Sequence, residues 1–235
     1  RQIEIASAAG NGEAVGQEPA QTQMLGIGEP VAEEDRPIDG LSRRNDGIAV
    51  KTYLPNYSEF YERRWFSSSE DLPVHEISLA ELGLGGDENI PIGRNVLFTI
   101  GDGTRIGLEV CEDLWTPVSP STLMTLGGAE VILNLSASNE TVGKRSYRRD
   151  LVRHQSSVCG CVYAYCSSGC TESTQDLVFS GHSLVAAGGT VLAENEKIID
   201  TDYMILCDAD LGKLRAGRRH NKSVKDAVSL YSGIE

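Results

Sequence analysis

The sequence lacks several features that define whole classes of protein. No stretch reaches the roughly 18 apolar residues of a membrane span, and the N-terminus shows no basic-then-apolar signal pattern. Basic residues are in the minority, since 21 Lys and Arg stand against 34 Asp and Glu, for a formal net charge of −13. Nucleic-acid-binding proteins need a basic face that displaces counterions. We therefore expect neither a membrane nor a nucleic acid as a partner.

A disulfide scaffold is also absent, because six cysteines in 235 residues do not match the dense pattern of short secreted chains. We expect a reduced, cytoplasmic protein. Four of the cysteines form a C-x-C-x₄-C-x₃-C series that fits no common zinc or iron–sulfur spacing. We interpret these four as reduced core thiols, and we predict no metal site: Cys159, Cys161, Cys166 and Cys170.

Two further groups of residues have side chains that are common in binding sites, but neither group is interpreted as a site. The four histidines are scattered, and we predict surface or core positions for them: His75, His154, His182 and His220. A basic run suggests an anion site, but on an acidic protein a solvated helix face paired with carboxylates is the preferred interpretation: Lys144, Arg145, Arg148, Arg149 and Arg153.

Composition divides the chain into an N-terminal segment and one domain. The first 45 residues hold eight Asp and Glu, with frequent Gly, Gln and Pro and no period of 2 or 3.6. This composition predicts loop or disordered chain, so we assign residues 1–46 to an irregular or atypical segment. The ordered domain is expected at 47–224, and residues 225–235 form a tail.

Short apolar runs predict strands at 47–50, 129–135 and 162–166. Two pairs of runs flank Asp-Gly or Gly-Gly and predict hairpins, at 95–100 with 105–110 and at 182–187 with 190–195. A helix is predicted at 143–158, and its apolar stripe is expected to be Tyr147, Leu151, His154 and Val158. Because several strands are apolar on both sides, we predict an α/β fold of sheets covered by helices.

Cys111 and Lys51 are the candidate catalytic residues. Cys111 follows the predicted strand 105–110, and a turn at a strand end gives a nucleophile a rigid mount beside backbone N–H groups. Lys51 follows the strand 47–50, where an ammonium could lower the pKa of a thiol and stabilise an oxyanion. Taken singly, a buried structural cysteine and a surface lysine are the more common readings.

Four motifs in order change this balance. The first motif is Lys-Thr-Tyr-Leu-Pro-Asn-Tyr, which begins at Lys51, and the second is Cys-Glu-Asp-Leu-Trp, which begins at Cys111. The third is Asn-Leu-Ser-Ala-Ser-Asn-Glu-Thr-Val-Gly-Lys at 134–144, and the fourth is Glu-Ser-Thr-Gln-Asp-Leu-Val at 172–178. This series resembles the nitrilase-type glutaminase domain of glutamine-dependent NAD synthetases. The resemblance covers residues 47–224 and implies an α-β-β-α sandwich.

The resemblance implies a Glu–Lys–Cys triad that hydrolyses glutamine through a thioester. Cys111 matches the nucleophile, and Lys51 matches the lysine that stabilises the tetrahedral intermediate. By the same resemblance, three residues match glutamine-binding positions, and a fourth is suited to the substrate's α-ammonium. The three are Tyr57, Ser138 and Lys144, and the fourth is Glu112.

Two parts of the family pattern have no match. The triad glutamate lies in a Phe-Pro-Glu-Leu-like strand end near the N-terminus, and the nearest substitutes here, Glu13 and Glu29, are poor ones. We therefore expect the first strand–helix–strand unit to be lacking. The synthetase domain, with its Ser-Gly-Gly-x-Asp-Ser loop, has no match either. ATP and Mg²⁺ are expected only in that missing domain, and this domain needs no cofactor.

Three functions remain open from the sequence. The first is a glutaminase that passes ammonia to a synthetase domain or subunit for NAD synthesis, assembled as a homo-oligomer as is common in this superfamily. The second is a free-standing carbon–nitrogen hydrolase that acts on another small amide. The third is a catalytically defective chain, a fragment or a partner-binding module, because the triad glutamate is not visible.

Overall fold

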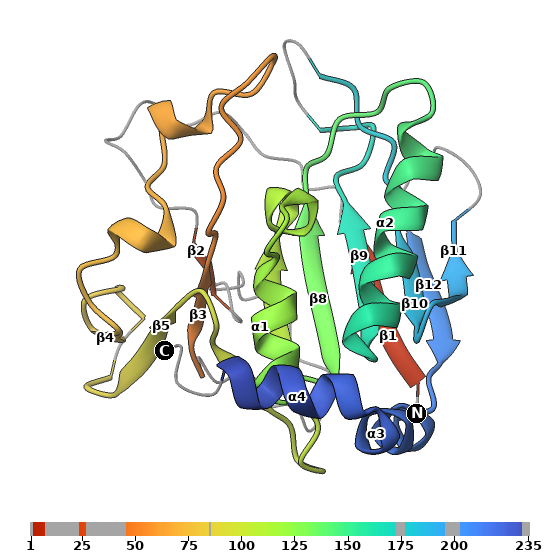
Figure 1. Cartoon of the computed structure of the whole chain (residues 1–235). Helices are drawn as coiled ribbons and strands as arrows, with labels where there is room; N and C mark the ends of the chain where they lie inside the picture. Colours follow the sequence, from red (N-terminus) through yellow and green to blue (C-terminus); the bar gives the residue numbers. More distant parts are fainter. Residues whose placement is uncertain are drawn as a thin grey trace.

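The computed structural model describes residues 2–7, 24–26, 46–84, 86–172, 177–195 and 203–231, with a six-stranded sheet at its centre (Figure 1). The strand order is β11-β10-β9-β8-β7-β6. β7, β8 and β9 run parallel, whereas β6, β10 and β11 join the sheet by antiparallel pairing. The bounds are β6 Leu97–Thr99, β7 Arg105–Val110, β8 Val131–Ser136, β9 Val162–Ser167, β10 Leu184–Ala187 and β11 Thr190–Glu194.

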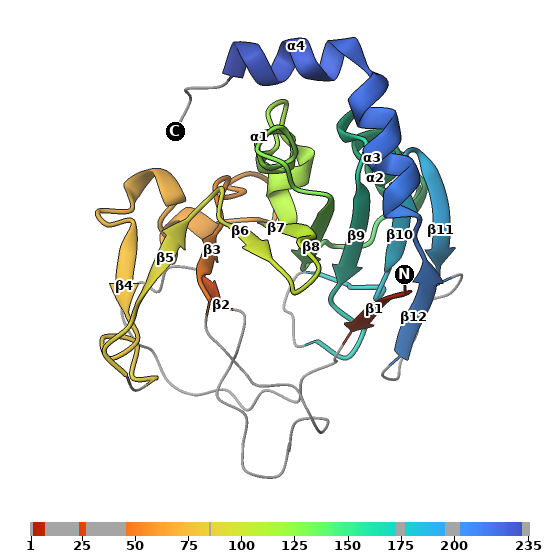
Figure 2. The same cartoon turned by 90° about the horizontal axis from the view of Figure 1, so that it is seen from below.

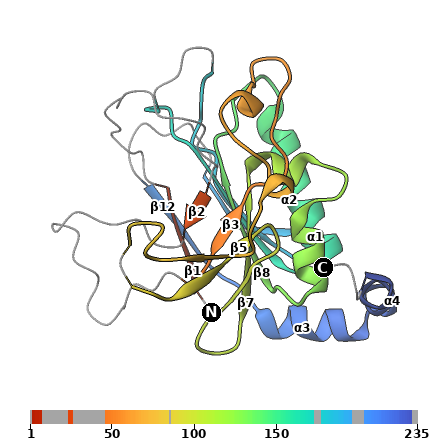
Figure 3. The ribbon, with the colours of Figure 1, turned by 90° about the vertical axis from the view of Figure 1, so that its left-hand side faces the viewer.

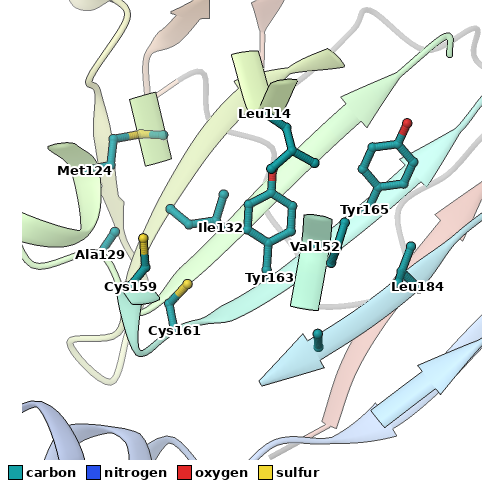
Figure 4. Packing of buried hydrophobic residues seen from close by; sticks show 11 residues of the cluster. Leu114, Met124, Ala129, Ile132, Val152, Cys159, Cys161, Tyr163, Tyr165 and Leu184 are labelled. Atoms are coloured by element: carbon teal, nitrogen blue, oxygen red, sulfur yellow. The ribbon is translucent and has the colours of Figure 1, made fainter. Parts of the chain in front are cut away.

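Two helices, α1 (Pro120–Leu126) and α2 (Lys144–Cys159), cover one face of this sheet (Figures 1 and 3). The largest core cluster lies between them and the strands, where Ile132, Val152 and Tyr163 are fully buried (Figure 4). Because burial of apolar surface is the main favourable contribution to folding, this layer supplies much of the domain's stability. The two helices thereby fix the positions of the strand ends that carry the site.

The opposite face packs against two smaller sheets. The first is the antiparallel pair β1 (Gln2–Ser7) and β12 (Tyr203–Asp208), and Val162 and Val185 of the central sheet pack against residues of β12. The second has the order β2-β3-β5-β4, and Ala49 packs against Phe98 and Leu108. Figure 2 shows these sheets at the two ends of the central one. The remaining bounds are β2 Met24–Gly26, β3 Ile48–Val50, β4 Glu76–Ser78 and β5 Asn89–Gly93.

The described chain closes with two helices, α3 (Leu211–His220) and α4 (Lys222–Tyr231). Asp210 caps α3 by accepting a hydrogen bond from the Lys213 N–H at 2.9 Å. Arg218 donates to the carbonyl of Ala129 at 2.6 Å, which holds α3 against the loop that leads into β8. α4 runs through residue 224, where the sequence placed the end of the domain. None of the described helices has the length and apolarity needed to span a membrane.

The predicted strands, both hairpins and the long helix are confirmed, and so is the mixed α/β fold class. The N-terminal segment differs from its expectation, because residues 2–7 and 24–26 form β1 and β2. Composition missed these strands because each is defined by backbone pairing with a distant partner, β12 or β3. Glu13 and Glu29 lie outside the described residues, so the expectation of a lacking strand–helix–strand unit stays a prediction.

The predicted apolar stripe of α2 is wrong at three of its four positions, whereas Leu151 is partly buried and packs against the core as expected. Tyr147 and Val158 are 61% and 54% exposed, and His154 is exposed as well. The buried face lies one residue further along, and polar members dominate it: Arg148, Val152, Gln155, Ser156 and Cys159. The hydrophobic pattern failed here because it assigns every polar residue to the solvent-facing side of a helix. Polar side chains that are buried with hydrogen-bond partners are therefore misplaced.

Two valines of α2, the buried Val152 and the exposed Val158, allow the observed buried face to be tested with the same substitution. Val152→Ala removes two fully buried methyl groups and is expected to lower the free energy of unfolding by about 2 kcal/mol. Val158→Ala trims a side chain that is more than half exposed, so a change within about 0.5 kcal/mol is expected. Urea denaturation followed by circular dichroism measures both. Equal losses would contradict the burial of this face.

Candidate active site

Cys111 stands at the carboxyl end of β7, where the chain turns into the 3-10 helix η3 (Cys111–Trp115). Its φ of 50° lies in the left-handed region, which non-glycine residues seldom adopt and which often marks a functional position. The side chain is 9% exposed. Because β7, β8 and β9 are parallel, the ends of all three strands meet at this edge of the sheet, as in other α/β ligand sites.

The buried carboxylate of Asp113 joins this turn to the neighbouring sheet. It accepts hydrogen bonds from the backbone N–H of Val110 at 3.0 Å, of Thr52 at 3.1 Å and of Tyr53 at 2.8 Å. Burial raises the pKa of Asp113 to about 7, although the N–H groups of Val110 and Tyr53 lower it. One side chain therefore holds the segment after β3 against the end of β7.

Lys51 lies in that segment and is 1% exposed. Its ammonium forms an ion pair with Glu62, in the 3-10 helix η1 (Glu62–Arg64). The positive charge of Lys51 lowers the pKa of the Cys111 thiol and the negative charge of Glu62 raises it, so the three groups act on one another at short range. The structure brings together the two predicted catalytic residues and adds a carboxylate to them.

The net effect at Cys111 is nevertheless a raised pKa, because burial outweighs the effect of Lys51. Two hydrogen bonds to the sulfur, from the backbone N–H of Ala137 and from the hydroxyl of Ser136, partly offset the effect of burial and lower the pKa of the thiol. An N–H directed at this position can also stabilise an oxyanion that forms beside the sulfur. A thiol with a raised pKa is protonated at neutral pH, so its attack on an electrophile requires a nearby base.

Three of the residues predicted to contact substrate, Tyr57, Glu112 and Lys144, lie near the thiol. The Tyr57 hydroxyl donates to both oxygens of Glu112, at 2.8 and 3.0 Å. Burial raises the pKa of Glu112, and Lys51 and Lys144 lower it. The Lys144 ammonium contacts Asn139 and lies 5.2 Å above the Trp115 ring. Acidic and basic groups therefore both lie close to Cys111.

Ser138, the fourth predicted contact, is buried in the loop after β8. Arg148 donates to its hydroxyl at 3.4 Å and to the carbonyl of Asn139 at 3.3 Å. Arg148 is fully buried, forms an ion pair with Glu140 at 3.0 Å, and bonds the ring of His182 at 2.9 Å. This network fixes the shape of the loop 138–140.

The basic run on α2 is only partly a solvated face. Arg145 and Arg149 pair with Glu194, and Arg153 with Asp150, as expected, but Arg148 is a core residue. The prediction failed at Arg148 because its partners Glu140 and His182 come from elsewhere in the chain. Of the four cysteines predicted to be core thiols, Cys159, Cys161 and Cys166 are buried, whereas Cys170 is exposed.

Most of the motif at 172–178 falls on residues 173–176, which lie outside the described residues. In the described ranges, no group of three or more His, Cys, Asp or Glu residues is placed to hold a metal ion.

Sequence reasoning missed Glu62, Asp113 and Ala137 as parts of the site. Glu62 lies within the aromatic-rich stretch that follows Lys51, and no spacing rule distinguishes it from Glu59 in the same stretch. Asp113 is visible in the Cys-Glu-Asp-Leu-Trp motif, but its role depends on N–H groups some 60 residues earlier in the chain. Ala137 contributes only its backbone, which no residue pattern reveals.

The strand-end cysteine, its lysine and the sandwich of sheets and helices define a class of amide-cleaving enzymes. The chain belongs to the carbon–nitrogen hydrolase family, whose pattern matches residues 31–219. It is 38% identical over 174 residues to the glutamine-dependent NAD(+) synthetase of Mycobacterium leprae, and this stretch is 73% of the chain but 25% of that protein. The chain therefore spans about a quarter of such relatives.

Solved structures agree with this assignment. The glutamine-dependent NAD(+) synthetase of Cytophaga hutchinsonii superimposes with a TM-score of 0.57 at 29% identity, over 69% of this chain and 25% of that one. A member of the nitrilase superfamily from Saccharomyces cerevisiae has the same fold, with a TM-score of 0.54 at 18% identity over 76% of this chain and 54% of that one. The predicted nitrilase-type sandwich is thereby confirmed.

His182 makes the stability of this region depend on pH. Burial, with Arg145 and Arg148 nearby, lowers its pKa from 6.5 to about 4, although Glu194 raises it. The unfolded chain therefore binds more protons than the folded one between pH 6.5 and 4, so stability falls as the pH falls through this window. His182→Gln is expected to flatten this decline in the free energy of unfolding, measured by urea denaturation at several pH values. The exposed His154→Gln is the control, and an equal flattening there would contradict the assignment.

Proposed function

We propose that this chain is the glutamine-hydrolysing domain of a glutamine-dependent NAD(+) synthetase. The observation that carries the proposal is Cys111, held in a left-handed turn at the end of β7 beside the Lys51–Glu62 ion pair. The likeness to the Mycobacterium leprae and Cytophaga hutchinsonii proteins supports glutamine as the amide. The acidic and basic groups around the thiol suit an amino acid whose side chain ends in that amide.

In the first half of the reaction, Cys111 attacks the carboxamide carbon of glutamine while Glu62 takes the thiol proton. Lys51 and the Ala137 N–H stabilise the negative oxygen of the tetrahedral intermediate. The C–N bond then breaks, the nitrogen receives the proton from Glu62, and ammonia leaves behind a thioester. In the second half, water loses a proton to Glu62 and attacks the thioester, the C–S bond breaks, and glutamate and the protonated thiol are released.

The predicted binding residues orient the substrate. Glu112, held by Tyr57, accepts from the α-ammonium of glutamine. Lys144 and Ser138 face the α-carboxylate. Lysine supplies the charge without the two-pronged geometry of arginine, so this contact selects for a negative group more than for its orientation.

The ammonia is a substrate for a synthetase domain or subunit, which uses ATP and Mg²⁺ to amidate nicotinic acid adenine dinucleotide. We assign no cofactor to the domain described above, because a thiol, an amine and a carboxylate suffice for amide hydrolysis. Its partners are glutamine, the synthetase domain and further copies of itself. The free thiols suit a reducing compartment, and we place the protein in the cytoplasm.

Glutamine hydrolysis by the chain tests the proposal directly. We expect ammonia and glutamate in equal amounts from the unmodified chain, and a loss of several orders of magnitude in Cys111→Ala, because the thioester cannot form. Cys207→Ala, which removes a free thiol on β12, is the matched control and is expected to keep full activity. Coupled-enzyme assays of both products provide the measurement.

The other candidate functions give distinct results in this assay. Ammonia release that survives Cys111→Ala would refute the nucleophile. Turnover of acetamide or asparagine, but not of glutamine, would identify a hydrolase of another small amide. No release from any amide would identify a catalytically inactive chain.

Glu62→Gln separates proton transfer from simple ion pairing. The glutamine side chain introduced at position 62 can still accept a hydrogen bond from Lys51 through its amide oxygen, but it cannot accept a proton. We therefore expect kcat to fall by about 10² to 10⁴ with little change in KM. Glu70→Gln, which changes an exposed glutamate paired with Arg94, is the control and is expected to leave kcat unchanged. Steady-state kinetics measure both constants. A kcat within a few-fold of the unmodified value would show that another group is the base.

A further inference from the structure

Tyr165 is a buried side chain that neither the fold nor the proposed mechanism explains. It lies on β9, opposite Asn134 of β8 in the parallel ladder, and its side chain is fully buried. Among the residues that the structure describes, none forms a hydrogen bond with its hydroxyl. The great majority of buried hydroxyls in native proteins are bonded, so an unbonded one requires an explanation.

The neighbouring Tyr163 shows how the same strand satisfies a buried tyrosine. Its hydroxyl donates to the Glu109 carboxylate and accepts from the Asn134 amide at 3.0 Å. The two tyrosines are two residues apart, so they extend from the same face of β9. Figure 4 shows the hydroxyl of Tyr165 directed away from Leu184 and the rest of the cluster. The described part of the core accommodates the Tyr165 ring but offers its oxygen no hydrogen-bond partner.

The surroundings of this hydroxyl are those of the active site. Burial and the negative charge of a Cys111 thiolate together raise the pKa of Tyr165 to about 12. The Ser136 and Ser138 hydroxyls oppose this rise from nearby, but neither meets the geometry of a hydrogen bond to the Tyr165 oxygen. These are the residues that line the thiol and the loop after β8. Tyr165 is therefore a neutral hydroxyl beside the reacting centre at pH 7, with a proton free to donate.

A second unbonded atom lies on the side chain packed against Tyr165. The Arg148 guanidinium stands 5.8 Å from the centre of the Tyr165 ring, and its Nε–H has no hydrogen-bond partner in the described part of the chain. Both groups can donate, and an arginine N–H can do nothing else. A ligand that satisfies them must offer oxygen acceptors, as an amide or a carboxylate does.

We propose that Tyr165 is a substrate-contacting residue whose hydroxyl donates a hydrogen bond to an oxygen of the amide substrate bound beside Cys111. The inference rests on the proposed amidase function and adds a contact to it. Tyr165 would then be left unbonded in the free protein so that the substrate, and not the core, supplies its partner. Its contribution is to orientation in the bound state, while Cys111 performs the covalent step.

The proposal predicts an unusual pairing of effects for Tyr165→Phe, which removes one oxygen atom. The melting temperature is expected to stay the same or rise, because no hydrogen bond within the described protein is lost. Glutamine binding is expected to weaken about tenfold, as loss of one hydrogen bond to a bound ligand implies. The binding is measured by calorimetry as the Kd of Cys111→Ala/Tyr165→Phe against Cys111→Ala, neither of which turns glutamine over. In the catalytically intact background, KM should rise more than kcat falls.

Tyr163→Phe is the matched control with the opposite pattern. It removes a hydroxyl that bonds Glu109, so its melting temperature is expected to fall while the Kd for glutamine, measured below that temperature, stays unchanged. A Kd unchanged by Tyr165→Phe would overturn the inference, and so would a lowered melting temperature, which would show a structural partner. If the Cys111→Ala chain binds no glutamine and the unmodified chain releases no ammonia, the proposed function fails and the inference falls with it. Glutamine binding that is indifferent to Tyr165 leaves the proposed function intact.

Discussion

The buried carboxylate of Asp113 is the interaction on which the site depends. Backbone N–H groups that are buried at the ends of strands need hydrogen-bond acceptors. A carboxylate can accept several hydrogen bonds at once, and Asp113 accepts those of Thr52, Tyr53 and Val110. Two strands of different sheets are thereby joined at their carboxyl ends. Lys51 and Cys111, which directly follow those strands, are held near each other as a consequence.

The same arrangement recurs on the helical face of the central sheet. Glu109, one residue before the end of β7, accepts from the Ser119 hydroxyl and the Ser121 N–H, both at 2.8 Å, at the start of α1. Arg148 of α2 bonds Glu140 and His182. Buried charges are costly unless they are paired and hydrogen-bonded, so each network favours one placement of its helix or loop. Polar bonds therefore set the fine geometry, while apolar burial supplies most of the stability.

The fold was largely predictable from local patterns, because strands buried on both faces read as continuous apolar runs. Gly47–Val50, the run before Cys111 and the run at 129–135 all became strands. The pattern failed on α2, where Arg148 and Gln155 occupy the buried face that Tyr147 and Val158 were expected to fill. Gln155 is accommodated because Ser121 and Thr122 of α1 accept from its amide, at 2.9 and 3.0 Å. No local pattern contains such partners.

By itself, the sequence determined which residues could carry the chemistry: Cys111 and Lys51 each follow a short apolar run, and local periodicity is enough to locate strand ends. Only the tertiary structure decided what surrounds them. It paired Lys51 with Glu62, raised the pKa of the Cys111 thiol by burial, and left the nearby Tyr165 hydroxyl without a hydrogen-bond partner among the described residues. The physical reason is that burial and hydrogen bonding depend on atoms brought together from distant parts of the chain, whereas strand and helix preferences depend on near neighbours.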